Sequence, residues 1–468
     1  MAFSFRFRRP QYVLLSSFLT AYCGSAAIMI MPLLAKERLG AEPALLGMYG
    51  FLANLPYSVV SFNMGWIGRR AGLRGSLTIG YLSLIAANFL MRAATGKYFI
   101  FAPCLLWGLS AGLFWPAVEG ANAEGQRPEQ IKRGVSYFIV AWVSGNLFGF
   151  FSSGWLYGLS DTGLLPFDVS TALLLCLMAL AFAPRVLEIA PWEAAPPEEH
   201  FTAPLERRRL FARLGLLANF GLFMGLSCVR ILLPQYANAA GLTGARYGFL
   251  MTTSMIGYLL ANAVLGRWHG WHYRGRFLVA SQLAAAAALV WFSFATGYAA
   301  LCVAQTILGA MAGLTYFSSI YYGMELNEDK REHGGYHEGV IALAMGAAPL
   351  LGGWLMAATG WDRSAFAAAA GFIVLSAGAQ TVLVSKAGKK NIEYRISNNE
   401  CRSEDERLGA EQPGCARHDH PWISVAFRPS APGGFCHSFS RKYAAAAGRM
   451  RYSSPVSRAC SWANSIRS

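Results

Sequence analysis

The sequence predicts an all-α polytopic membrane protein with twelve transmembrane helices in two pseudo-symmetric six-helix bundles. Three observations support this class. The 468 residues are 54% hydrophobic and 14% charged, with a mean hydropathy of +0.35, whereas soluble domains carry about 25% charged residues. Apolar stretches of about 20 residues, long enough to cross a hydrocarbon core, recur from residue 11 to 385. Glycines also recur at a constant offset along the chain.

The apolar stretches are separated by short polar breaks, and they lack the two-residue alternation of a membrane β-strand. The first follows Arg8 and Arg9, as in a secretory signal, but it is longer than a signal core and leads directly into another span. We therefore interpret it as an uncleaved helix. The predicted spans are 11–34, 44–66, 76–95, 98–120, 134–157, 165–186, 211–236, 246–266, 277–296, 299–322, 336–357 and 364–385.

The glycine repeat has an offset of 201 residues. Two windows, 40–145 and 241–346, each hold 15 glycines, so about two coincidences are expected by chance. Eight are found, which indicates an internal duplication. The pairs are Gly40/Gly241, Gly47/Gly248, Gly65/Gly266, Gly96/Gly297, Gly108/Gly309, Gly112/Gly313, Gly134/Gly335 and Gly145/Gly346. We expect the glycines at 108/112 and 309/313 to be points of close helix packing.

The net charge of +15 does not indicate nucleic-acid binding, because the basic residues are divided among short loops. With the N-terminus inside, the predicted cytoplasmic segments hold most of them, for example Arg207–Arg209 and Arg213, and the opposite loops hold few. This is the positive-inside pattern. It predicts that both termini are cytoplasmic, in a bacterial-type inner membrane.

A polar segment divides the helical part of the chain, and a second one follows it. The domain organisation expected is an N-terminal six-helix bundle at 1–187, a cytoplasmic linker at 188–209, a C-terminal six-helix bundle at 210–387 and a disordered cytoplasmic tail at 388–468.

The break between the second and third spans carries a glycine-rich basic motif. Its residues Gly65, Arg70, Gly72 and Arg74 match the pattern Gly-x-x-x-Asp-Arg-x-Gly-Arg-Arg/Lys. Together with the twelve spans, the repeat and the central linker, this motif resembles the major facilitator superfamily over residues 11–385. The sequence departs from the pattern at Arg69, in the Asp position, and at Leu73. Because the family uses that Asp to hold the loop against neighbouring helices, this contact is not expected here.

The resemblance implies secondary active transport of a small solute by alternating access, a site between the bundles, a conformational role for the loop and a monomer. The chain lacks the Gly-x-x-x-x-Gly-Lys-Ser/Thr phosphate loop, so ATP hydrolysis is not expected. We expect no enzyme activity, no cofactor and no metal site. The expected partners are a small-molecule substrate, membrane lipid, and protons or another coupling ion.

Arg230 is the principal candidate for substrate binding, since a charge inside a span costs about 2.5–3.5 kcal/mol on insertion scales. Asn219 and Ser227 share its helical face. A guanidinium facing a cavity would bind an anionic group, which favours an organic anion or metabolite as substrate. The alternative is an arginine that extends to the interface or pairs with a carboxylate.

Glu119, His337 and Glu338 are candidates for ion coupling. A desolvated Glu119 would be suited to carry a proton, although pairing with Arg127, Lys132 or Arg133 at the membrane interface is the simpler interpretation. His337 and Glu338 would titrate together, or merely begin a solvated helix. Polar residues that complete a possible cavity are Tyr22, Asn54, Tyr57, Gln282, Gln305 and Tyr316.

Two other functions remain open. The first is a proton-coupled exporter of drugs or amphiphiles, although Cys104 occupies the position where such exporters often carry an arginine, four residues before Gly108. The second is a non-transporting receptor or assembly factor on the same scaffold. Substrate-dependent flux would separate these from a metabolite carrier.

Overall fold

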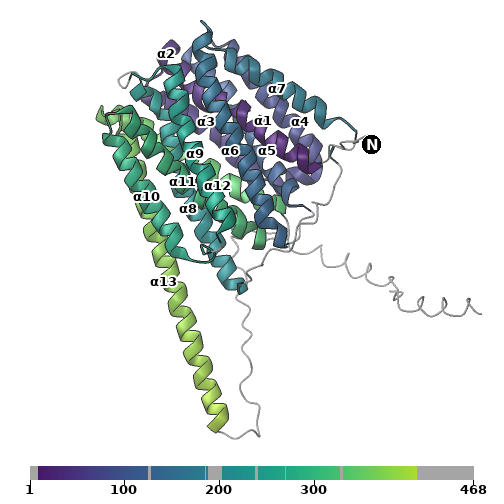
Figure 1. Ribbon diagram of the computed structural model, residues 1–468, viewed down its shortest axis with the longest axis vertical. Helices are drawn as coiled ribbons and strands as arrows, with labels where there is room; N and C mark the ends of the chain where they lie inside the picture. The colour runs from purple at the N-terminus through teal and green to yellow at the C-terminus, as the bar shows by residue number, and fades with distance from the viewer. Residues whose placement is uncertain are drawn as a thin grey trace, which may run out of the picture. The chain divides into compact units, whose positions relative to one another are not determined.

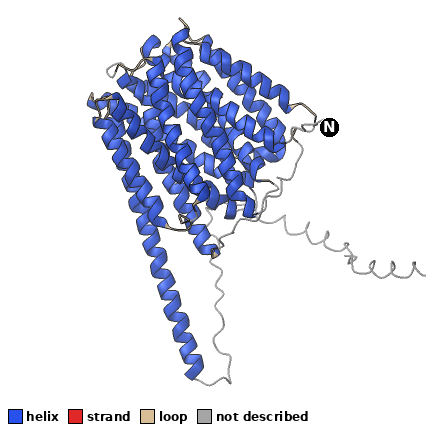
Figure 2. Cartoon of the chain, viewed as in Figure 1, coloured by secondary structure: helices blue, strands red, loops and turns tan. Residues whose placement is uncertain are grey.

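The computed structural model describes residues 9–124, 128–184, 186–187, 203–237, 241–268, 270–326 and 330–407. Its contacts divide the chain into two units, Met1–Glu393 and Tyr394–Ser468. Both predicted bundles lie in the first unit. The described residues are almost entirely helical and contain no strand (Figure 2).

The first half of the chain supplies six helical segments (Figure 1). They are α1 (Arg9–Ser25) continued by the π-helical η1 (Ala26–Ile30) and α2 (Met31–Leu39), α3 (Pro43–Phe62), α4 (Met64–Arg92), η2 (Lys97–Ile100) with α5 (Phe101–Ala123), α6 (Pro128–Leu159) and α7 (Leu165–Ala181). The second half supplies α8 (Leu205–Ala237), α9 (Gly244–Arg267), α10 (Gly275–Phe294), α11 (Tyr298–Leu326), α12 (Lys330–Thr359) and α13 (Ser364–Arg407).

Each of the twelve predicted spans corresponds to one of these segments. Within the described residues, 11 helices are long and apolar enough to cross a membrane, and Leu165–Ala181 is apolar but shorter. The predicted all-α polytopic class is therefore confirmed.

The boundaries differ most from the prediction in two places. The basic loop before the third span is itself helical, so α4 begins at Met64, and its backbone breaks at Gly72, where φ is +64°. Glycine adopts this left-handed conformation without steric cost. In addition, α13 continues to Arg407, so residues 388–407, which belong to the predicted disordered tail, are helical. Most of the predicted linker and residues 408–468 lie outside the described part of the chain.

The two halves repeat the same close helix contacts. A Cβ at Gly108 on α5 would collide with the backbone of Ala53 on α3, and a Cβ at Gly309 on α11 would collide with Ser254 on α9. Ala53 and Ser254 are themselves 201 residues apart. The repeated glycines therefore pack equivalent helices together, as predicted. Gly40, which ends α2, and Gly241, which precedes α9, both have a positive φ, +64° and +62°.

The most extensive contacts between the halves are those of α3 with α12 and of α6 with α9. Hydrogen bonds cross between them. Ser58 Oγ donates to the Gly339 carbonyl at 3.1 Å, and Asn262 Nδ2 donates to Ser136 Oγ at 3.2 Å. Gln235 Nε2 on α8 donates to the Ala41 carbonyl at 3.0 Å. These contacts enclose the space in which the candidate site lies.

Candidate functional site

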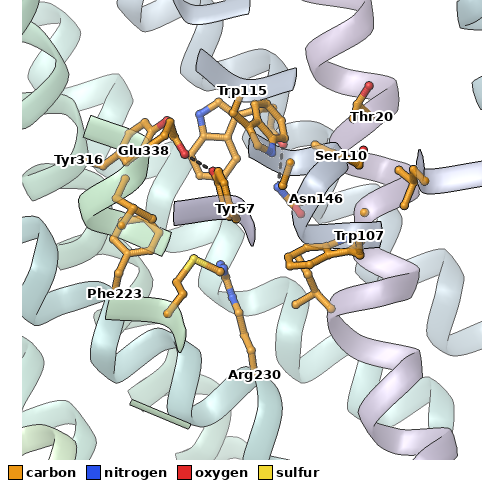
Figure 3. Close-up of a pocket in the computed structure, with 18 residues that line it drawn as sticks. Thr20, Tyr57, Trp107, Ser110, Trp115, Asn146, Phe223, Arg230, Tyr316 and Glu338 are labelled. Atoms are coloured by element: carbon orange, nitrogen blue, oxygen red, sulfur yellow. Dashed lines mark hydrogen bonds between the residues drawn. The ribbon is translucent and has the colours of Figure 1, made fainter. Parts of the chain in front are cut away.

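A cavity of about 90 Å³ lies between the two halves (Figure 3). This is several times the roughly 10–15 Å³ that one buried water needs. Helices α1, α3, α4, α5 and α6 line it from the first half, and α8, α11 and α12 line it from the second. Its walls combine aromatic side chains with two charged ones, Arg230 and Glu338.

Arg230 reaches this cavity from α8. Its side chain is 5% exposed, and Nε has no hydrogen-bond partner. The guanidinium lies 5.8 Å from the centroid of the Phe150 ring, and no ion pair of Arg230 is found within the described ranges. A buried guanidinium without a counter-ion is costly, and its Nε–H has lost water without gaining an acceptor. This cation is thus available to an anionic ligand in the cavity.

Glu338 on α12 marks the other charged end of the cavity, as Figure 3 shows. It is 4% exposed. Tyr57 of the first half donates a hydrogen bond to Oε2, and Tyr316 on α11 donates to Oε1 at 3.3 Å. These two hydroxyls fix the carboxylate where both halves meet.

Glu119 on α5 lies next to the Glu338 carboxylate. Tyr316 Oη also hydrogen-bonds to Glu119 Oε1, at 3.1 Å, and Glu119 Oε2 has no partner. The sequence favoured an interfacial Glu119; the structure instead buries it, at 2% exposure, beside Glu338 on the opposite half.

His337 completes the cluster. Its Nδ1 is 3.1 Å from Ser319 Oγ, and its Nε2, which has no hydrogen-bond partner, lies 3.9 Å from Glu338 Oε1. Ligand atoms of Glu119, His337 and Glu338 all lie within 4.8 Å of one another. Two ionised carboxylates at that distance would repel by about 3 kcal/mol at an effective dielectric constant near 20. A proton or another cation between these groups would relieve that repulsion.

Aromatic side chains form the walls between the two charged ends. Trp115 and Trp142 are 6.4 Å apart between ring centroids, and Trp142 lies 5.2 Å from Tyr316. Phe223 on α8 packs 5.9 Å from the same tyrosine. Such walls suit a ligand with a flat, apolar or cationic part.

The structure separates the predicted substrate-binding residues into three groups. Arg230, Tyr57 and Tyr316 line the main cavity. Ser227 and Asn54 line a small neighbouring pocket of about 10 Å³ with Arg230. Four others are not among the residues that line either space: Tyr22, Asn219, Gln282 and Gln305.

These four residues have other surroundings. Tyr22 accepts a hydrogen bond from Ser152 at 2.8 Å and so links α1 to α6. Gln282 Nε2 donates to the Leu278 carbonyl within its own helix. Asn219 and Gln305 are fully buried, and their side-chain amides have no hydrogen-bond partner.

The conformational loop lies at the start of α4. Arg70 stacks over Trp66 at 4.2 Å, and Arg74 lies 5.8 Å from the Phe182 ring. Gly65 adjoins the second half, because a Cβ there would stand 3.7 Å from the Glu332 side chain. The loop thus contacts α12 without the Asp of the family motif.

Sequence reasoning missed several lining residues, among them Trp107, Trp142 and Asn146. Asn146 Nδ2 donates to the Trp142 carbonyl, and its Oδ1 accepts from Ser25 at 3.2 Å. A polar or indole side chain inside a predicted span was the available signal, but many such residues only pack helices.

Comparisons with known proteins agree with this architecture. The Major Facilitator Superfamily model matches residues 215–395. This match spans α8 to α13, so the second half of the chain is similar to the Major Facilitator Superfamily. The protein is an integral, multi-pass membrane protein.

Two solved structures share the fold. The nucleoside transporter NupG matches with a TM-score of 0.59 and 12% identity. The match covers 80% of this chain and 100% of the NupG chain. The E. coli fucose:proton symporter FucP matches with a TM-score of 0.53 and 15% identity, covering 79% of this chain and 98% of its own. Comparison with curated protein sequences gives no match.

Proposed function

We propose that this protein is a secondary active transporter that moves a small solute with an anionic group by alternating access of its two halves. The observation that carries this proposal is Arg230, a buried guanidinium without a counter-ion, in a cavity lined by both halves. The printed activities of its structural neighbours, nucleoside transport and fucose:proton symport, support transport of a small solute.

Arg230 is suited to recognise a carboxylate or phosphate. A charge-assisted hydrogen bond contributes about 1.5–3 kcal/mol, and a guanidinium can form two in parallel. Because no carboxylate of the described residues pairs with Arg230, binding an anion removes an existing cost as well as adding contacts.

We infer that the coupling ion binds at Glu119, with His337 and Glu338 next to it. These groups come from both halves, so movement of one half against the other would change the distances among them. A cation that binds there stabilises the state in which the halves meet. We infer that a proton or another cation bound at this cluster couples its gradient to solute movement.

The expected orientation places both termini in the cytoplasm, in a bacterial-type inner membrane, as the loop charges indicate. Glu119 is near the end of α5 and Glu338 near the start of α12. In this orientation the cation cluster lies toward the cytoplasmic side of Arg230.

Uptake of candidate organic anions into proteoliposomes tests the proposal. Arg230→Gln should abolish saturable uptake. Arg363→Gln is the matched control, because Arg363 donates to the Ser293 and Ala295 carbonyls and does not line the cavity. Equal uptake by Arg230→Gln and the unchanged protein would remove Arg230 from the site.

A second candidate is a proton-coupled exporter of drugs or amphiphiles, which the aromatic walls favour. It predicts that hydrophobic cations, rather than anions, bind the purified protein, and that Arg230→Gln strengthens their binding by removing a like charge.

A further inference from the structure

The two charges of the cavity are opposite in sign and are not paired with each other. Arg230 enters from α8, and Glu338 lies beside Tyr57 and Tyr316 on another side of the cavity (Figure 3). In the described part of the chain, Arg230 has no ion pair, and the one such contact of Glu338 is with His337 Nε2, at 3.9 Å. The cavity is therefore dipolar, with a cationic and an anionic end.

The anionic end also has the features of an ammonium site. Tyr57, Trp115, Trp142 and Tyr316 line the cavity together with Glu338. Aromatic faces attract an ammonium group, with a stronger effect where water is excluded. The carboxylate adds a direct acceptor. Glu119 does not line the cavity, so it remains available to the coupling ion.

We propose that the substrate is zwitterionic, with an acidic group at Arg230 and an ammonium group at Glu338 among the aromatic side chains. This inference deepens the proposed function, on which its relevance to transport rests. It replaces a general organic anion by a solute that carries both charges.

Charge complementarity distinguishes this class from simpler solutes. A monoanion satisfies Arg230 but leaves Glu338 without a cation and is repelled by it. A monocation leaves the guanidinium unpaired, and a neutral solute leaves both ends uncompensated. Since each buried charge left unpaired weakens binding, the cavity selects against all three classes.

Binding to the purified protein, measured by calorimetry, tests the inference without transport. Matched probes keep one hydrocarbon and change only the charges. The sets are alanine, propionate and ethylamine; γ-aminobutyrate, butyrate and propylamine; and phenylalanine, hydrocinnamate and phenethylamine. We expect that the zwitterion of at least one set binds about tenfold or more tightly than both of its singly charged analogues. The inference is overturned if no zwitterion binds at millimolar concentration, or if the monoanion binds as tightly in every set.

Substitutions then assign the charges. Glu338→Gln should weaken zwitterion binding about tenfold while leaving the anionic analogue unchanged or tighter, and Arg230→Gln should weaken both. The control Glu325→Gln removes a carboxylate that bonds Tyr273 outside the cavity, and it should change neither affinity. If Glu338→Gln still unfolds cooperatively but loses affinity for both the zwitterion and its anionic analogue, the assignment of the ammonium group to Glu338 is contradicted.

The two proposals can fail separately. A zwitterion that binds as expected but is not moved across proteoliposomes would leave this inference standing and refute transport. Transport of an anion by a protein that binds no zwitterion would support the transport function and refute this inference.

Discussion

The two halves of this protein repeat each other in their helix contacts and differ in their buried charges. Gly108 and Gly309 bring equivalent helices together at positions 201 residues apart. At the same offset, Arg230 corresponds to Met29 and Glu119 to Ile320. Packing requires both halves to be alike, whereas a cavity that binds a dipolar solute requires them to differ. Buried positions where the symmetry fails are therefore the strongest functional candidates.

The largest effect should follow from making α8 resemble η1, its equivalent at the 201-residue offset. Arg230→Met places in the second half the residue that stands at the equivalent position of the first. We expect transport and anion binding to fall about 100-fold or more, since charge-assisted hydrogen bonds are lost. The free energy of unfolding should rise by about 1–4 kcal/mol, because an uncompensated buried charge is removed.

Chemical denaturation and proteoliposome uptake measure the two effects of Arg230→Met side by side. A variant that loses both stability and transport would show that Arg230 is structural. The difference in buried charge between the two halves at this position would then serve stability rather than function.

Breaking the cation cluster should have the next largest effect. Glu119→Gln removes one of two carboxylates whose ligand atoms lie within 4.8 Å of each other. We expect gradient-driven uptake to fall about tenfold, within the usual range of coupling energies, while exchange of solute across the membrane without a gradient continues. Counterflow and gradient-driven assays on one preparation separate the two activities. Equal losses in both assays would argue against a coupling role.

The repeated glycines offer a direct test of symmetry. Gly108→Val and Gly309→Val each force a side chain against a facing backbone, on Ala53 and Ser254 respectively. Both should lower the free energy of unfolding by similar amounts, about 1–3 kcal/mol or more. Gly96→Ala and Gly297→Ala form a control pair at the same offset, since no atom lies within 4 Å of either added Cβ. Unequal losses at 108 and 309 would show that the halves pack differently.

The sequence predicted the spans because hydrophobic length is a local property, and it predicted the repeat because close packing requires glycine at fixed places. It could not predict which polar residues face the cavity, since this depends on how each helix is rotated against its neighbours. Tyr316 and Gln305 lie on the same helix, yet only Tyr316 lines the cavity. Glu119 was assigned to the interface because its partner, Glu338, is distant in sequence.

The smallest effect concerns the helix starts after Gly40 and Gly241. Thr243 caps α9, with its hydroxyl accepting from the Arg246 amide at 3.5 Å, whereas its equivalent Glu42 makes no such bond at α3. Thr243→Ala should therefore cost about 1 kcal/mol, and Glu42→Ala should remove no cap.

Glu42 instead bonds Lys97 at 2.7 Å, and this hydrogen bond lowers the pKa of the Glu42 carboxyl. A carboxyl whose pKa is lower in the folded state stabilises that state at pH values above its unfolded-state pKa. This stabilisation is lost as the pH falls through the folded-state pKa. The melting temperatures of the unchanged protein and Glu42→Ala should thus converge below about pH 4. Those of Thr243→Ala should remain apart from the unchanged protein at every pH, because a threonine cap carries no titrating group. A pH-dependent gap for Thr243→Ala would show that the two helix starts are stabilised in the same way after all.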